Sequence, residues 1–260
     1  MPDRHSHGTK IPGKSLDVRQ MKVTSTLPPG QRETADFPRF GLTPFATRFP
    51  ADTETITIQI AGDVRTSIEV STEMDRLARV EQCSDFHCVT TWTTRSLSWS
   101  GVQFADFYQQ IVVPLAGAPD NATFVVLRGQ DGARTSLPLD DLLAHDVLLA
   151  DRLNGHPLSI AHGAPIRLVA PKHYGYKSIK HVNRIEFWRS SSGYRPLGFR
   201  FMVHPRARVA HEERGQWIPD WLLRYLYRPL IGPTSRRFAQ EMQKHLHKID
   251  ILENRYGKPE

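Results

Sequence analysis

Short apolar runs of β type recur along the middle of the chain, and turn residues such as glycine, proline and aspartate soon follow each run. Isoleucines alternate with polar residues over 56–60, and the segment NRIEFW at 183–188 alternates again. The runs FVVL at 124–127 and IRLV at 166–169 are equally short. Such patterns are typical of half-buried or buried strands separated by tight turns. The middle of the chain is therefore predicted to be β-rich.

Only two stretches of this middle region have helical character. Residues 68–79 predict the end of a strand followed by a short helix, and leucines spaced by three and four within 136–153 predict short helical pieces broken near His145. Short strands mixed with few helices indicate an α+β domain, which we place at residues 36–199. The polar segment 1–35 shows neither period and is interpreted as an arm.

The last sixty residues differ from the rest. One helical stripe follows Gly215, and its apolar positions are Ile218, Trp221, Leu222, Tyr225 and Leu226. Pro229 is expected to end or kink this helix, and a second helix is expected over about 235–252. Residues 200–260 are therefore predicted to form a basic helical extension. The sequence leaves three roles open for it: packing on the body, a homodimer contact, or an anchor on a membrane surface.

The net charge of +7 comes almost entirely from the two ends. Residues 1–35 carry +3, residues 200–260 carry +5, and the long middle carries −1. A nucleic-acid-binding body would carry the basic excess itself, so this distribution argues against nucleic acid as the main partner.

Cysteine usage and hydropathy bear on the compartment and on metals. Cys83 and Cys88 are the only two cysteines, too few for a disulfide framework or a structural zinc site. The sequence shows no apolar run of signal-peptide or membrane-span length, so the expected location is the cytoplasm. Cys83 is interpreted as a small buried hydrophobe. Cys88 follows a polar, aromatic loop, where a thiolate facing a pocket would suit a soft or redox-active metal.

A segment free of acidic residues, 162–184, carries +5 within the otherwise neutral middle. Its cations are Arg167, Lys172, Lys177, Lys180 and Arg184. Glycines in such turns let backbone N–H groups approach an anion. Arg167 lies in a strand pattern and needs an anionic partner if buried. A phosphate-bearing cofactor explains the segment better than a solvated basic face, although no P-loop or GxGxxG motif accompanies it.

Three segments together resemble a known family. DFHCVTTWT at 85–93, WSGV at 99–102 and LNGHPLSIAHGAPIRLVAPKHYGYKSIKHVNRIEFW at 153–188 are similar to molybdopterin-dependent oxidoreductases of the sulfite oxidase family, in particular its small bacterial branch. The resemblance spans about 36–190. It implies a mixed, β-rich α+β fold that holds one molybdenum-molybdopterin per chain, with the nucleotide form of the pterin left open.

The resemblance assigns residues to this cofactor. Cys88 matches the metal-ligating cysteine, and its pKa is expected to be depressed as a metal ligand. The residues expected to contact the pterin and its phosphate are Phe40, Gly41, Gly129, Asp131, His162, Arg167, Ser178, Ile179 and Lys180. Besides Cys88, the catalytic candidates are His87 and Arg95. For these two the alternatives are a structural hydrogen bond and a surface position.

The implied activity is a two-electron oxo transfer on a small substrate, with electrons passing to an external partner because no haem-binding segment is seen. Sulfite itself is doubtful, since Ala133 and Arg134 stand where the family carries a tyrosine, and Arg39 is one position away from the expected sulfite-pocket arginine. The alternatives are an S-oxide or N-oxide reductase of the same fold, a cofactor-binding scaffold without activity, and a non-catalytic phosphate or nucleic-acid binder.

Overall fold

The computed structural model describes residues 18–20 and 26–256. Most of the predicted N-terminal arm lies outside these residues. The described part of 1–35 contains two short strands, β1 (Val18–Gln20) and β2 (Arg32–Glu33), where the sequence showed no strand period. Both pair in parallel with long strands of the body, β1 with β5 and β2 with β6.

The first sheet has seven strands and contains the longest ones in the described chain. Its main path runs β1–β5–β6–β9–β10, while β11 pairs with β9 and β2 with β6. The further bounds are β5 (Arg79–His87), β6 (Trp92–Gln103), β9 (Leu148–Leu153), β10 (His156–Pro157) and β11 (Arg167–Val169). The antiparallel pair β5–β6 is a hairpin whose last paired residues are His87 and Thr93.

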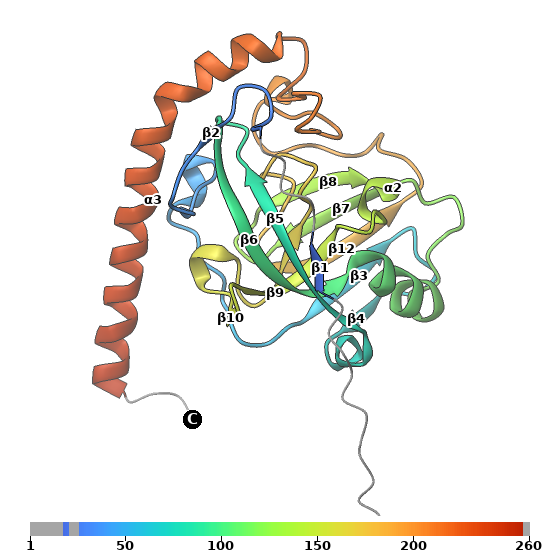
Figure 1. Ribbon diagram of the computed structural model, residues 1–260. Helices are drawn as coiled ribbons and strands as arrows, with labels where there is room; N and C mark the ends of the chain where they lie inside the picture. Colours follow the sequence, from blue (N-terminus) through green and yellow to red (C-terminus); the bar gives the residue numbers. More distant parts are fainter. Residues whose placement is uncertain (1–17, 21–25, 257–260) are drawn as a thin grey trace, which may run out of the picture.

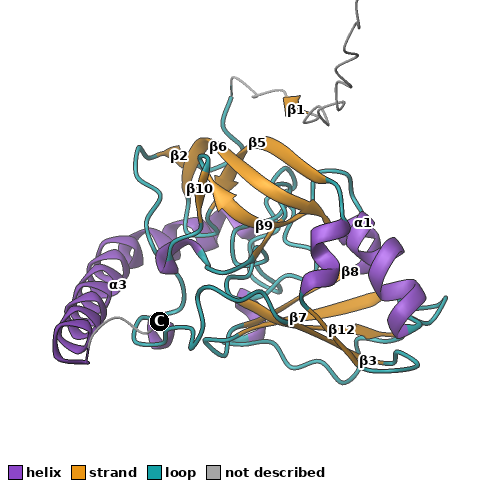
Figure 2. Cartoon of the chain, turned by 90° about the horizontal axis from the view of Figure 1, so that it is seen from below, coloured by secondary structure: helices purple, strands orange, loops and turns teal. Residues whose placement is uncertain are grey.

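The second sheet has five strands in the order β4–β3–β12–β7–β8, and only β3 and β12 are parallel. Its strands are β3 (Ile58–Gly62), β4 (Ile68–Val70), β7 (Phe124–Gly129), β8 (Arg134–Pro138) and β12 (Val182–Trp188). Figure 2 shows the two sheets as separate layers. The four predicted strands are confirmed as β3, β7, β11 and β12, and so is the predicted α+β class.

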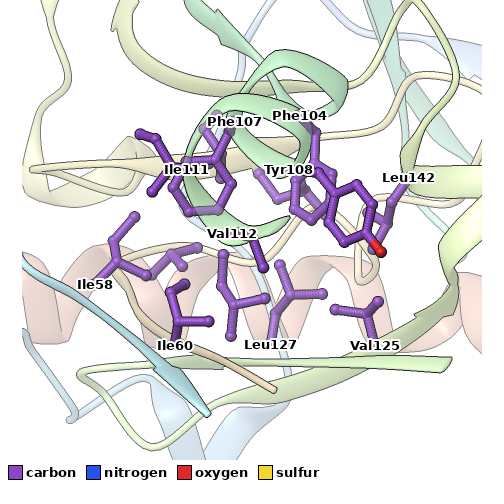
Figure 3. Packing of buried hydrophobic residues seen from close by; sticks show 14 of the residues in the cluster. Ile58, Ile60, Phe104, Phe107, Tyr108, Ile111, Val112, Val125, Leu127 and Leu142 are labelled. Carbon is purple, nitrogen blue, oxygen red and sulfur yellow. The ribbon is translucent and has the colours of Figure 1, made fainter. Parts of the chain in front are cut away.

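The main core lies between the second sheet and a helix that the sequence did not reveal. This helix begins as α1 (Phe104–Phe107) and continues as the wider π-helix η3 (Tyr108–Ala116). Figure 3 shows its Phe107 and Ile111 above Ile60 and Leu127 of the sheet. In the first sheet, alternate residues face two different cores, with Leu149 in this cluster and Leu148 in a second one around Trp99. The first sheet is therefore covered on both faces.

Short helical turns occupy loops between the strands. They are η1 (Thr43–Phe45), η2 (Thr72–Arg76), α2 (Leu139–Leu142), η4 (Ile160–His162) and η5 (Arg200–Met202). The strand end and short helix predicted over 68–79 are confirmed. The helical pieces predicted over 136–153 are wrong except for α2, because Leu148 and Leu149 face opposite cores from a strand, which leucine spacing alone does not distinguish.

A helical extension follows, but as one helix, α3 (Asp220–Tyr256), and not two. It runs through Pro229 and Pro233, and Figure 1 shows it bent along one side of the molecule. Of the two outcomes expected at Pro229, an end of the helix is wrong and a bend agrees with the structure. The helix continues because packing continues beyond Pro229: Phe238 is buried against the body. No helix in the described part of the chain has the length and hydrophobicity needed to cross a membrane.

Candidate functional site

Cys88 occupies the tight turn between β5 and β6. Its backbone N–H donates to the carbonyl of Trp92 at 2.8 Å, and the Thr91 N–H donates back to the Cys88 carbonyl at 3.1 Å. Thr91 adopts φ +89°, a strained value that closes the turn in so few residues. The Cys88 side chain is only 8% exposed. A hairpin end anchored by two long strands thus holds one buried thiol in place.

The surroundings of the Cys88 thiol shift its pKa in opposite directions. Burial raises the pKa of Cys88, while the Thr90 hydroxyl, 3.1 Å from Sγ, and the positive charges of Arg214 and Lys180 lower it. The lowered pKa of Cys88 that the sequence predicts applies to a metal-bound thiolate. In the protein alone burial dominates, and the pKa of Cys88 is raised. A soft metal cation bound to the thiolate would supply the positive charge that outweighs the effect of burial.

Arg167 is fully buried on β11 and is fixed by backbone carbonyls. Its guanidinium donates to the carbonyls of His162 and Ser178, both at 2.9 Å, and lies 5.0 Å from the centre of the Trp99 ring. Burial lowers the pKa of Arg167 to about 9. Within the residues that the structure describes, no carboxylate forms an ion pair with it, so the anionic partner expected from sequence is not supplied by this part of the chain.

The turn that precedes β12 brings Lys180 to the same place. Lys180 Nζ donates to the carbonyl of Ala161 at 2.6 Å. Gly163, at φ +112°, allows this approach, because a Cβ there would lie 3.1 Å from the Lys180 Cβ. Ser178 and Ile179 shape the turn: the Ser178 hydroxyl accepts the Ala170 N–H, and Ile179 is buried in the core. The predicted set His162, Arg167, Ser178, Ile179 and Lys180 therefore lies together.

Gly129 and Asp131 join this set from the second sheet. A Cβ on Gly129 would meet the Lys180 carbonyl at 2.5 Å, so glycine is required where β7 passes this turn. Asp131 accepts the Ala133 N–H at 3.0 Å. Burial lowers the pKa of Lys180 and of Arg39, and the negative charge of Asp131 partly opposes this lowering. Both predicted residues thus lie beside the cationic turn.

An aromatic cluster borders the site. Phe37 stacks on His162 with ring centres 4.7 Å apart, and it also packs edge-on against Phe86 and Trp99. Phe40 packs edge-on against Trp92, the first residue after the Cys88 turn, at 5.7 Å. These rings line one side of the site.

The loop that carries Phe40 and Gly41 is covered by α3. Phe238 of α3 stacks on Phe40 with ring centres 6.3 Å apart, and a Cβ on Gly41 would touch its ring. Arg39 donates to the carbonyls of Phe45, Ala46 and Arg48. Its guanidinium, which also lies over the Phe238 ring, organises this loop instead of pointing into an open pocket.

Excess positive charge is the main electrostatic property of the site. Burial lowers the pKa of Lys180, and the charges of Arg167 and Arg39 lower it further. Burial, Lys180 and Arg167 likewise lower the pKa of His162 to about 4. His162 Nδ1 is buried without a hydrogen-bond partner among the described residues. A buried ligand with a phosphate would balance these positive charges, and its hydrogen-bonding edges would fit the unpartnered His162 Nδ1. The Cys88 thiol fits a soft metal.

The two other catalytic candidates lie close to Cys88 in sequence but have structural partners. His87 Nδ1 is 2.9 Å from the Thr93 hydroxyl, and burial lowers the pKa of His87 to about 4. Arg95 lies 3.6 Å from carboxylate oxygens of both Asp85 and Glu33. Their catalytic roles remain predictions.

Arg214 is a site residue that sequence reasoning missed. Its fully buried guanidinium donates to the carbonyls of Val89, in the Cys88 turn, and of Pro29, and it pairs with Glu212. It therefore joins the N-terminal segment and the Cys88 turn, and its backbone N–H donates to Asp220 at the start of α3. The only sequence feature that pointed to Arg214 was the excess of basic residues in 200–260, which did not distinguish this buried arginine from exposed ones.

We expect Arg214→Met to lower the free energy of unfolding by roughly 3–5 kcal/mol, because two buried carbonyls lose their donor and Glu212 loses a partner. Urea denaturation measures this change. Arg224→Met is the matched control, since Arg224 binds the same Glu212 from a partly exposed position. Equal losses in the two variants would contradict the role given to Arg214.

Lys177 was predicted only as one cation of the acid-free segment. Its Nζ donates to the carbonyls of Ser136 and Pro205, each at 2.7 Å, and its side chain is fully buried. Burial lowers its pKa from 10.5 to about 7, despite the opposing charges of Asp141 and Glu213. Lys177 thus ties residues 204–209 to the body and is distinct from the cationic turn at Lys180.

A pH dependence of stability follows from this shift. Between pH 7 and 10.5 the unfolded chain binds the Lys177 proton more tightly than the folded one, so stability rises with pH in this window and is insensitive to Lys177 below it. From pH 7 to 9 the wild type should gain about 2 kcal/mol relative to Lys177→Met. Denaturant titrations at both pH values test this, and parallel pH profiles for the two proteins would contradict it.

Comparison with known proteins shows the family to which this chain belongs. The oxidoreductase molybdopterin binding domain matches residues 46–194, more than half of the chain. The chain therefore belongs to this family of molybdopterin-binding oxidoreductases, the sulfite oxidase family that the sequence motifs resemble.

Individual relatives cover different shares of the chain. The uncharacterized oxidoreductase YuiH of Bacillus subtilis is 35% identical over 177 residues, which are 67% of this chain and 85% of YuiH. The protein-methionine-sulfoxide reductase catalytic subunit MsrP of Xanthomonas axonopodis pv. citri is 27% identical over 72% of this chain and 60% of MsrP. Mouse mitochondrial sulfite oxidase is 30% identical over 53% of this chain but only 24% of its own length.

Proposed function

We propose that this molybdopterin oxidoreductase catalyses two-electron oxo transfer on a small substrate. The observation that carries the proposal is the position of the buried Cys88 thiol near a cationic turn that lacks enough negative charge. Lys180 lies close enough to Cys88 for each charge to shift the pKa of the other. One molybdenum cofactor per chain would occupy this space, with its metal on Cys88.

In this arrangement the protein would bind and orient the cofactor and shield it from water. Arg167 and Lys180 would hold the phosphate of the cofactor, and His162 Nδ1 would hydrogen-bond to its pterin. Phe37 and Phe40 would keep water from one side of the site, which would strengthen these electrostatic contacts. The bound molybdenum cofactor supplies the two-electron redox chemistry and the exchange of an oxo group with substrate. Electrons would leave through an external protein partner.

Sulfite is not the substrate that this site favours. Arg39, the arginine nearest the expected sulfite-pocket position, binds three backbone carbonyls and lies over an aromatic ring. An S-oxide reductase is the second candidate, and similarity to MsrP, a protein-methionine-sulfoxide reductase subunit, over 72% of this chain favours it. The expected cytoplasmic location stays a prediction.

Metal and pterin analysis of the full chain, produced in a host that makes the cofactor, tests the proposal. We expect about one molybdenum and one oxidisable pterin per chain. Activity is then assayed in both directions, as sulfite oxidation with ferricyanide and as methionine sulfoxide reduction with a reduced viologen dye. Reduction without sulfite oxidation would support the S-oxide reductase. Purified protein without molybdenum or pterin would overturn the proposal and leave the non-catalytic phosphate binder.

A further inference from the structure

Large apolar side chains are exposed around the start of α3. They include Phe199 and Trp217, 70% and 74% exposed, and Trp221, 58% exposed. With them we define the apolar face as Phe199, Trp217, Trp221, Leu222, Tyr225, Leu226 and Leu230, all at least 37% exposed. Isolated exposed apolar residues are normal, but seven in a group of this kind need an explanation.

The helix itself cannot bury this face. Leu223 and Tyr227, on the opposite side of the same turns, are buried against the body. Residues 221–233 are thus apolar around most of the helix, over about 20 Å of its axis. A helix with this pattern is normally buried on all sides. In Figure 1 the beginning of α3 lies at the top of the molecule, away from both sheets.

Within residues 221–240 of α3 every charged side chain is an arginine. Arg200 lies 5.9 Å from the Trp217 ring centre and Arg228 lies 5.2 Å from that of Tyr225. Arg236 and Arg237 follow directly on α3, and residues 221–240 contain no acidic residue. Asp220, at the helix start, accepts a hydrogen bond from the backbone N–H of Arg214, so its carboxylate is engaged within the chain.

Aromatic and leucine side chains bordered by arginines are the combination that holds a helix in the plane of an anionic bilayer surface. We propose that the apolar face of α3 docks on an anionic membrane surface, with its arginines at the level of the lipid phosphates. A second copy of the chain fits less well, because it would bring Arg228 and Arg236 of the two copies together without carboxylates at that face. The inference is independent of the proposed function.

Vesicle sedimentation of the full-length holoenzyme tests this docking. We expect binding to vesicles containing 30% phosphatidylglycerol, little binding to pure phosphatidylcholine, and weakening as salt rises. Leu226→Glu should reduce binding by at least about tenfold. The matched control is Leu246→Glu, which changes an equally exposed leucine of the same helix outside the apolar face and should bind as the wild type does. Molybdenum content should be unchanged in both variants.

Tryptophan fluorescence gives a second readout, since brominated lipids should quench Trp217 and Trp221, and Trp221→Ser should remove much of that quenching. Three results would overturn the proposal. One is no binding to the anionic vesicles, and another is an equal loss of binding in Leu226→Glu and Leu246→Glu. The third is a dimer, detected by light scattering, that Leu226→Glu dissociates, because this would assign the face to a second copy.

Discussion

Cys88→Ser is expected to yield a folded protein that lacks molybdenum. A serine hydroxyl has nearly the size of the thiol and can keep the contact to Thr90, so the turn should survive. It does not ionise near neutral pH and is a poor ligand for a soft metal. We therefore expect the molybdenum content and the dye-linked activity to fall at least about 100-fold, more than the loss typical of residues that only support a ligand. Elemental analysis and turnover measure both effects.

Cys83→Ser is the matched control for this result. Cys83 lies on the same strand, β5, five positions before Cys88, and is a partly buried free cysteine. It should retain the metal and the activity. Molybdenum in Cys88→Ser equal to that in Cys83→Ser would show that the cofactor is held without the thiolate, and the assignment of Cys88 would be wrong.

Arg167→Lys is expected to show the second large effect, although it conserves the formal charge. One ammonium group cannot reach the carbonyls of both His162 and Ser178, which the guanidinium now spans. A lysine this deeply buried would also tend to lose its proton. We expect a loss of roughly 2–4 kcal/mol in the free energy of unfolding and loss of most of the bound pterin.

Two measurements separate these consequences. Urea denaturation of cofactor-free protein measures the change in the free energy of unfolding. Fluorescence of the released, oxidised pterin measures how much pterin the variant retains. Arg184→Lys is the control, because Arg184 belongs to the same acid-free segment but is 40% exposed and pairs with Glu186. If Arg167→Lys retained as much pterin as Arg184→Lys, the phosphate site would have to lie elsewhere.

The sequence predicted which candidate site residues lie together better than it predicted the strands around them. His162, Arg167 and Lys180 were predicted to lie together from the acid-free segment and the resemblance. Gly129 and Asp131 were added from the resemblance alone. The two strands of the hairpin β5–β6 were not predicted, and the segment before Cys88 was interpreted as a loop, since serines, threonines and aspartates conceal the alternation. Burial of that sheet on both faces weakens the pattern further.

Tertiary packing explains the remaining differences. Pro229 predicts a helix end from local rules, but Phe238 lies against Phe40 beyond it and stabilises a continuous helix. Arg214 could not be recognised because its partners, Val89 and Pro29, are 125 and 185 positions away. A single sequence carries no signal for such distant pairs of a side chain and a backbone carbonyl.

The contacts of Arg214 also set an order of events during synthesis. The match to the family domain ends at residue 194, yet the Cys88 turn receives one of its buried hydrogen-bond donors only from residue 214. A nascent chain lacks this buried contact until residue 214 has left the ribosome. Cofactor insertion should therefore follow translation, and a fragment trimmed to the family boundaries should load molybdenum poorly.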